Sequence, residues 1–426
     1  MRTSGSKSLG RLLAVLSFML AATLAWSHPM PKTAVMLKFR NDRIDAELLL
    51  PVVELKLGWD KPLPDDAEHT VSEYGLELKS YVADHIRPVA PDGEPWSVVV
   101  HSVTPVPDTF PDVRVDLSMI PPKGQPVDRL TFNYDVIFHH LITHEAIISV
   151  VGDWRNGLIS DKPVVLATMW DRTRSIEIDR SGGSWFRGFA ATFRLGMRHI
   201  AEGTDHLLFL LALLLPAPLA LGTKKWGEFV GAKVAIRKIV KVVSAFTVGH
   251  SITLLFGALQ WVRVPEAPIE AAIALSIFVS AIHAFVPVFR GREMFVAGGF
   301  GLVHGLAFAA TLNGFGFDAL TLVTSIFSFN LGIETFQLFV IGLAMPIFIL
   351  LARTRFYRFF RGVGATVTAI ASATWFGERV FGWSNPVSPV VERAAAHATW
   401  VLVSLLVVAV AANLFERSRR SALEPA

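Results

Sequence analysis

The sequence predicts a polytopic α-helical membrane protein of about seven transmembrane helices, preceded by an N-terminal β-rich, sandwich-like soluble domain. The first reason is composition: the 426 residues are 52% hydrophobic and only 18% charged, which exceeds the apolar fraction of ordinary globular domains. The second is distribution, because segments near the ~20 apolar residues that a helix needs to cross a bilayer follow one another downstream of residue 195. The 31 Phe and 11 Trp also suit lipid-facing and interfacial surfaces.

The pattern of residues 1–27 predicts a secretory signal peptide. Arg2, Lys7 and Arg11 form a basic n-region, and the apolar core from Leu12 to Leu24 is too short for a stable span. An uncleaved membrane anchor is the alternative.

Residues 28–185 predict an extracytoplasmic β-rich domain with one helical insertion. Strand-like runs are separated by turn residues such as Asn41-Asp42, and residues 71–85 have a helical pattern. The expected strands are 34–39, 43–50, 97–103, 113–119, 130–138, 146–151 and 164–168. His140 and His144 would share one strand face, which could form a metal site, but we interpret them as ordinary surface or cross-strand groups.

The rest of the chain predicts an interfacial helix at residues 186–195, a seven-helix membrane domain at 196–415 and a cytoplasmic tail at 416–426. Aromatic and arginine residues at helical spacing favour the interfacial helix; the outer turn of the first span is the alternative. The seven apolar segments are 196–221, 236–260, 267–289, 294–314, 320–352, 358–376 and 395–415.

Basic residues concentrate in alternate connections between the predicted spans. Six of them lie in the first connection or in the first turns of the span after it, whereas the fourth connection has none. By the positive-inside rule, the β-rich domain is extracytoplasmic and the C-terminus is cytoplasmic. We therefore expect the bacterial inner (cytoplasmic) membrane. Because the net charge is only +4 and the basic residues flank apolar segments, nucleic acid is excluded as a partner in favour of the lipid bilayer.

Polar residues at membrane depth indicate where function lies. Ionisable groups there are costly and need a partner, a water-filled cavity or an ion. Histidine with carboxylate suits first-row divalent metals, and the absence of cysteine leaves only nitrogen and oxygen ligands. Hydrogen bonds that merely join helices are the alternative. Five histidines together with Asp205 and Glu334 are spread over five predicted spans, which favours one shared site; the histidines are His199, His206, His250, His283 and His304.

The first span poses a geometric question. His199 and His206 would lie about 10 Å apart along an unbroken helix, too far to contact one ion. Gly203-Thr204 is the place where the backbone could open. Either the helix is broken there, or the two histidines are successive stations on a path.

These residues resemble motifs of the HupE/UreJ family. The segment from His199 to His206 is similar to the His-x3-Gly-x-Asp-His signature, with Ile200 where the usual signature has Pro. His250-Ser251, Phe300–Gly305 and Phe329–Glu334 are similar to the later motifs. The resemblance implies a nickel permease-like accessory membrane protein of hydrogenase or urease systems. The metal ligands that it implies are His199, Asp205 and His206 in the first signature and His250, His304, Asn330 and Glu334 in the later motifs. The N-terminal extracytoplasmic domain places the chain with the longer branch, where residues 28–185 could capture metal, bind a periplasmic partner or gate the channel.

We therefore expect a membrane permease for a divalent transition metal ion, nickel or cobalt before zinc, with no nucleotide and without catalytic residues. One alternative is an intramembrane metal-dependent hydrolase, in which histidines and Asp205 hold the ion and Glu334 is the general base. Another is a membrane sensor or assembly factor with an outer ligand-binding domain.

Overall fold

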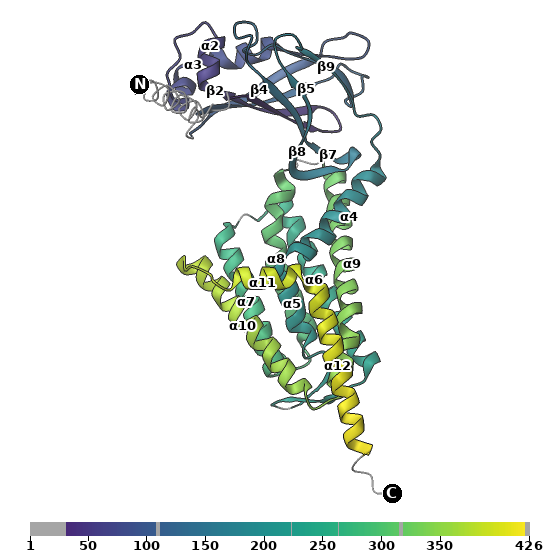
Figure 1. Cartoon of the computed structure of the whole chain (residues 1–426). Coiled ribbons are helices and arrows are strands. Elements are labelled where there is room, and N and C mark those ends of the chain that lie inside the picture. The colour runs from purple at the N-terminus through teal and green to yellow at the C-terminus, as the bar shows by residue number, and fades with distance from the viewer. Residues whose placement is uncertain (1–30, 108–110, 223, 263, 315–317, 422–426) are drawn as a thin grey trace, which may run out of the picture. The chain divides into compact units, whose positions relative to one another are not determined.

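The computed structural model describes residues 31–107, 111–222, 224–262, 264–314 and 318–421 (Figure 1). The predicted signal peptide at 1–27 lies outside these residues. The chain forms two compact units. The first, here called the β-rich unit, comprises residues 31–37, 43–149 and 164–178. The second, the helical unit, comprises residues 38–42, 150–163 and everything after 178.

Two sheets give the N-terminal part its β-rich character. In the larger, the strands follow the order β4-β5-β2-β1-β7-β8, and in the smaller β3-β6-β9. Alternate residues of β2 are buried, which is the pattern of a strand with one face on a core. The strands are β1 Thr33–Phe39, β2 Ile44–Pro51, β3 Ile86–Val89, β4 Ser97–Val106, β5 Asp112–Ile120, β6 Arg129–Tyr134, β7 Ala146–Asp153, β8 Leu158–Met169 and β9 Ser175–Asp179.

Two helices accompany these sheets, α2 (Val52–Gly58) and α3 (Ala67–His85). The side chain of Asp66 accepts a hydrogen bond from the backbone N–H of His69 and so caps α3. α3 packs on β4. The predicted helical insertion is therefore confirmed, and it begins four residues earlier than its apolar pattern. Sandwich packing of the two sheets stays a prediction.

The segment after β6 differs from expectation. We predicted a strand through residue 138, but β6 ends at Tyr134 and turns follow. The expectation that His140 and His144 share a strand face is therefore wrong. His144 is buried against Thr33 and Glu54, whereas His140 is 45% exposed beside Asp60.

The helical unit contains helices in every segment predicted to be apolar. The first is interrupted: α4 contains residues 186–195, expected to form an interfacial helix, and α5 follows after one residue. A short hairpin of β10 and β11 joins α5 to α6. The elements are α4 Trp185–Glu202, α5 Thr204–Leu214, β10 Leu219–Leu221, β11 Trp226–Phe229, α6 Ala232–Ala258, α7 Glu266–Phe285, α8 Glu293–Gly314, α9 Ala319–Ala352, α10 Tyr357–Phe381, α11 Ser388–Ala396 and α12 Ala398–Ser421.

Four helices among the described residues are long and apolar enough to cross a membrane. They are Ala232–Ala258, Ala267–Phe285, Ala319–Ala352 and Ala398–Ser418, and two shorter apolar helices accompany them, Thr204–Leu214 and Glu293–Phe308. These helices indicate a membrane protein. The count of seven spans remains a prediction.

Close helix contacts through glycine position the polar residues of the helical unit. α6 packs along α8 and α4 along α9 (Figure 1). A Cβ on Gly301 of α8 would lie 2.1 Å from the carbonyl oxygen of Phe246 in α6, and one on Gly196 of α4 would lie 2.0 Å from that of Phe329 in α9. Only glycine permits such backbone approach. The helices that carry the candidate ligands are thereby held side by side.

Candidate metal centre

The first span is broken at Gly203. α4 ends at Glu202 and α5 begins at Thr204, and Gly203 has φ −76° and ψ 96°, an extended conformation. A Cβ at this position would lie 2.7 Å from both the His199 carbonyl oxygen and His206 Nδ1, so glycine is required for space. The break places the rings of His199 and His206 4.6 Å apart between centroids. The chain therefore does not form the unbroken helix, which would have held the two rings farther apart.

Asp205 fixes the orientation of His206. Its Oδ1 accepts a hydrogen bond from the backbone N–H of His206 at 2.9 Å and lies 2.9 Å from Nδ1 of the same ring. In the neutral imidazole, Nδ1–H donates to the carboxylate, and the lone pair is then on Nε2. A carboxylate behind a histidine is the usual outer partner of a metal-ligating imidazole.

His250 of α6 is oriented from α9. The Asn330 amide nitrogen donates to the carbonyl oxygen of Ile326 at 2.8 Å, so its Oδ1 faces His250 Nδ1, 3.2 Å away. Nδ1 of His250 must then carry the proton, which leaves the lone pair on Nε2. Asn330 thus contacts the histidines through His250 and stands behind it.

His304 of α8 is oriented from α7. The Ser276 hydroxyl donates to the carbonyl oxygen of Ile273 at 2.7 Å, so its oxygen accepts from His304 Nε2 at 3.0 Å. The lone pair of His304 is therefore on Nδ1. Nothing in the sequence around Ser276 distinguishes it from the serines that commonly join helices, so sequence reasoning missed it.

Four ring nitrogens converge without partners. Within the part of the chain that the structure describes, His199 Nε2, His206 Nε2, His250 Nε2 and His304 Nδ1 are buried and have no hydrogen-bond partner. A buried nitrogen without a partner destabilises the folded state unless a ligand binds it. Ligand atoms of two overlapping trios lie within 4.8 Å of one another: His199, His206 and His250 form one, and Asp205, His206 and His304 form the other. His206 is common to both.

Aromatic rings surround the four histidines. Phe308 and Phe329 stack on each other and flank His199, with ring centroids 4.8 and 5.4 Å from it. Phe209 and Phe246 flank His304 at 5.4 and 5.1 Å. An apolar shell of this kind limits water access and strengthens electrostatic attraction inside. His250 and His304 are buried, whereas the Asp205 side chain at the α4–α5 break is 33% exposed.

Glu334 lies one helical turn beyond Asn330 and outside both trios. Its Oε1 accepts a hydrogen bond from Ser244 at 2.5 Å, and Gln337 accepts one from Thr247 at 3.1 Å. Together with His250–Asn330, these contacts form a row of polar pairs between α6 and α9. The structure therefore brings His199, Asp205, His206, His250 and His304 together and places Asn330 and Glu334 on the adjoining row.

A second polar group lies toward the C-terminal end of α5. It contains His283, which we expected in the shared site with the other histidines, and two residues that sequence reasoning did not assign to a site, Lys238 and Glu293. Lys238 Nζ is 3.7 Å from Glu293 Oε1, which is 4.0 Å from His283 Nε2. These three residues line a small cavity with Leu213, Pro216 and Phe300. The rings of Phe209, Phe246 and Phe300 separate this cavity from His304. Nδ1 of His283 accepts backbone N–H groups of Val288 and Phe289, so this ring offers a donor.

Most of the helical unit resembles a known protein family. A model of the family described as HupE / UreJ protein matches residues 173–379, a segment that includes all four histidines. No curated protein matches the chain. The N-terminal extra region is consistent with the longer branch of the family. The family implies a membrane protein with a nickel- or cobalt-related accessory or permease function. Over residues 173–379, the chain is similar to the HupE/UreJ family.

Proposed function

We propose that the helical unit is a permease for a divalent transition metal ion, nickel or cobalt before zinc. The observation that carries the proposal is the set of four buried, unpartnered ring nitrogens around the break at Gly203. A purely structural role would leave no reason for four imidazoles to point lone pairs into one aromatic-walled space.

The arrangement suits an ion that is bound and then released. Neutral imidazoles and one carboxylate offer borderline ligands without sulfur, which favours Ni²⁺, Co²⁺ or Zn²⁺ over Cu(I). Conduction requires binding that is favourable enough to enter yet weak enough to leave. Because His206 belongs to both trios, an ion can exchange His199 and His250 for Asp205 and His304 while it keeps one ligand.

Two features supply a route beyond the histidines. The α6–α9 row of polar pairs passes Asn330 and Glu334, and its α6 side leads toward the basic N-terminal half of that helix. The layer of Phe209, Phe246 and Phe300 stands between His304 and the cavity that holds Glu293. By the positive-inside rule the α4–α5 break faces outward and that cavity faces the cytoplasm. The bacterial inner membrane, with residues 28–185 outside, follows from the same rule.

The hydrolase alternative needs a general base near a metal-bound water. Glu334, the residue that it would use, is engaged by Ser244 and belongs to neither trio. We therefore favour transport. The sensor or assembly alternative predicts that deletion of the β-rich unit abolishes all function, whereas the permease keeps some uptake.

Nickel accumulation in cells tests the proposal. Cells that express the His206→Ala or Asp205→Ala variant should accumulate no more ⁶³Ni²⁺ than cells without the protein, while immunoblots show equal amounts in the membrane. His397→Ala is the matched control, because His397 is an exposed histidine whose Nδ1 bonds to its own helix at Arg393; its uptake should equal that of the wild type. Normal nickel accumulation in both the His206→Ala and the Asp205→Ala variant would contradict the proposal.

A further inference from the structure

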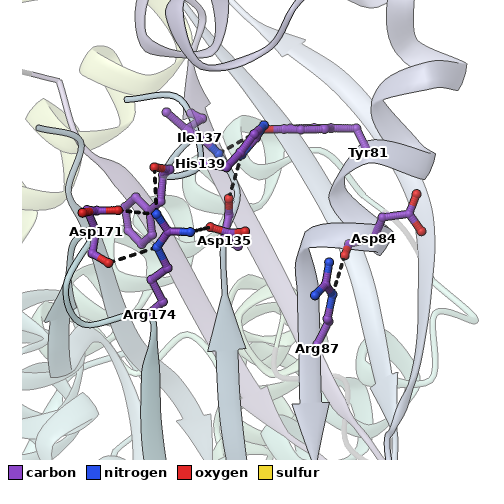
Figure 2. Close-up of polar contacts among 9 residues, drawn as sticks. Tyr81, Asp84, Arg87, Asp135, Ile137, His139, Asp171 and Arg174 are labelled. Carbon is purple, nitrogen blue, oxygen red and sulfur yellow. Dashed lines mark hydrogen bonds and ion pairs between the residues drawn. The ribbon is translucent and has the colours of Figure 1, made fainter. Parts of the chain in front are cut away.

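A separate group of metal-ligand side chains lies in the β-rich unit. One ligand atom each of His85, Asp135 and His139 lie within 4.8 Å of one another, and the two imidazoles stack with centroids 4.6 Å apart. Figure 2 shows Asp135 and His139 beside Tyr81 and Arg174. All three candidate ligands are half-buried, so the group is held in place yet can be reached from solvent.

Both histidines present the same nitrogen. His85 Nδ1 lies 2.7 Å from the carbonyl oxygen of Tyr81, and His139 Nδ1 lies 3.1 Å from that of Asp135. A carbonyl can only accept, so each Nδ1 carries the proton and each Nε2 carries the lone pair. A backbone carbonyl behind the distal nitrogen is a common outer partner of a metal-ligating histidine.

The backbone around His139 is held in an unusual conformation. Ile137 has φ 72°, which is a strained value for a β-branched residue. The Tyr81 hydroxyl accepts the backbone N–H of Ile137 at 2.9 Å, and the Ile137 carbonyl oxygen accepts those of His140 and Leu141. This turn brings His139 back over the end of α3. Strain of this kind persists where the surrounding structure holds a functional group in place.

The electrostatics favour a cation. His85 is the last residue of the 19-residue helix α3, whose C-terminal end carries partial negative charge. Asp135 adds a carboxylate, which Arg174 holds through Oδ1 at 2.6 Å, and Asp171 in turn pairs with Arg174 (Figure 2). Burial lowers the pKa of His139, so that ring stays neutral and able to ligate at pH 7.

We propose that His85, Asp135 and His139 form a second site for a divalent transition metal ion, in the β-rich unit and distinct from the histidines of the helical unit. Two imidazole nitrogens and one carboxylate oxygen bind first-row divalent ions, and three protein ligands leave further positions to water. Such a site binds exchangeably. It suits capture of an ion more than permanent storage, and it stands whether or not the helical unit transports.

Binding stoichiometry tests the proposal. Full-length protein in nanodiscs is dialysed against Ni²⁺, and bound nickel is measured by mass spectrometry. The His85→Gln/His139→Gln variant should bind one equivalent less than the wild type. The same loss should appear in an Asp205→Ala/His206→Ala background, where transport has been removed. His69→Gln is the matched control, because its ring is exposed and paired with Asp66 at the other end of α3, and it should bind as the wild type does. Unchanged stoichiometry in the double variant overturns the proposal.

A footprint on the wild type covers the case in which that variant misfolds. Diethyl pyrocarbonate should modify His85 and His139 more slowly with saturating Ni²⁺ than without it, because the reagent attacks the imidazole lone pair that a bound ion occupies. His69, which is exposed and paired with Asp66, should react equally in both conditions. Equal modification of His85 and His139 with and without nickel contradicts the site.

Discussion

Replacement of Gly203 by alanine tests whether the break in the first span assembles the metal centre. The φ of −76° and ψ of 96° are open to alanine, so backbone torsion does not oppose the change. Space does. The new Cβ would lie 2.7 Å from the His199 carbonyl oxygen and from His206 Nδ1, where ordinary contact begins at 3.4 Å. Two ligand-bearing residues must therefore move by about 0.7 Å.

A displacement of that size affects folding and binding by similar free energies. Overpacking of this kind costs about 1–3 kcal/mol of stability. Disturbance of ligand orientation costs roughly 10–100-fold in metal affinity, or about 1.4–2.8 kcal/mol of binding free energy. We expect Gly203→Ala to reach the membrane at near-normal levels but to bind Ni²⁺ at least tenfold more weakly, as measured by dialysis of purified protein.

Glycines elsewhere in the helical unit provide the control. A Cβ on Gly299 of α8 or on Gly342 of α9 would meet nothing within 4 Å. Gly299→Ala and Gly342→Ala should bind nickel as the wild type does. Wild-type affinity in Gly203→Ala at equal abundance would refute the reasoning, because the centre would then tolerate movement of its ligands.

Three further predictions concern charge. Asp205→Asn keeps an acceptor for His206 but loses the carboxylate charge, so nickel affinity in dialysis should fall roughly 10–100-fold; an unchanged isotherm would remove Asp205 from the centre. Glu334→Gln should leave nickel stoichiometry unchanged and slow uptake several-fold, because Glu334 lies on the polar row and outside both trios; a lost equivalent would make Glu334 a ligand. Burial lowers the pKa of His144 to about 4 from 6.5, so the unfolded chain binds the extra proton first. His144 thus stabilises the fold fully above pH 6.5, and about 3 kcal/mol is lost as the pH falls toward 4. Burial raises the pKa of neighbouring Glu54, which acts in the opposite direction. The protection factors of β1 amides, which correct for the slower intrinsic exchange at low pH, should fall over this range in the wild type and less in His144→Gln; an equal fall would contradict the assignment.

The local sequence pattern predicts the helices and strands that depend mainly on neighbouring residues. Each apolar segment contains a helix, and β1, β2, β4 and β5 lie where alternation places them. The strands β3 and β9 were not predicted. Both are short, and each belongs to its sheet only because it pairs with β6. β6 itself ends four residues early, at a turn whose Ile137 conformation depends on the distant Tyr81 hydroxyl. A one-dimensional pattern carries no such information.

The candidate metal centre is likewise predictable from the sequence only where it depends on nearby residues. Sequence spacing identifies Gly203 as the place where a break could bring His199 and His206 together, but it leaves two successive sites on an unbroken helix as the alternative. It does not indicate which helix supports which ring. His304 depends on Ser276, and His250 depends on Asn330, through contacts set by the packing of α6 against α8 and α9. The pairing of His85 with His139 was also missed, because a strand had been expected where the chain turns.

Nickel entry into proteoliposomes tests the central claim most directly. Purified protein is reconstituted at matched density, and luminal Ni²⁺ is followed with a trapped fluorescent indicator. The wild type should admit Ni²⁺ with saturable kinetics, and His206→Ala should admit no more than empty vesicles, since His206 belongs to both trios of ligands. Entry through His206→Ala at the wild-type rate, or no entry through the wild type above that of empty vesicles, would contradict the account.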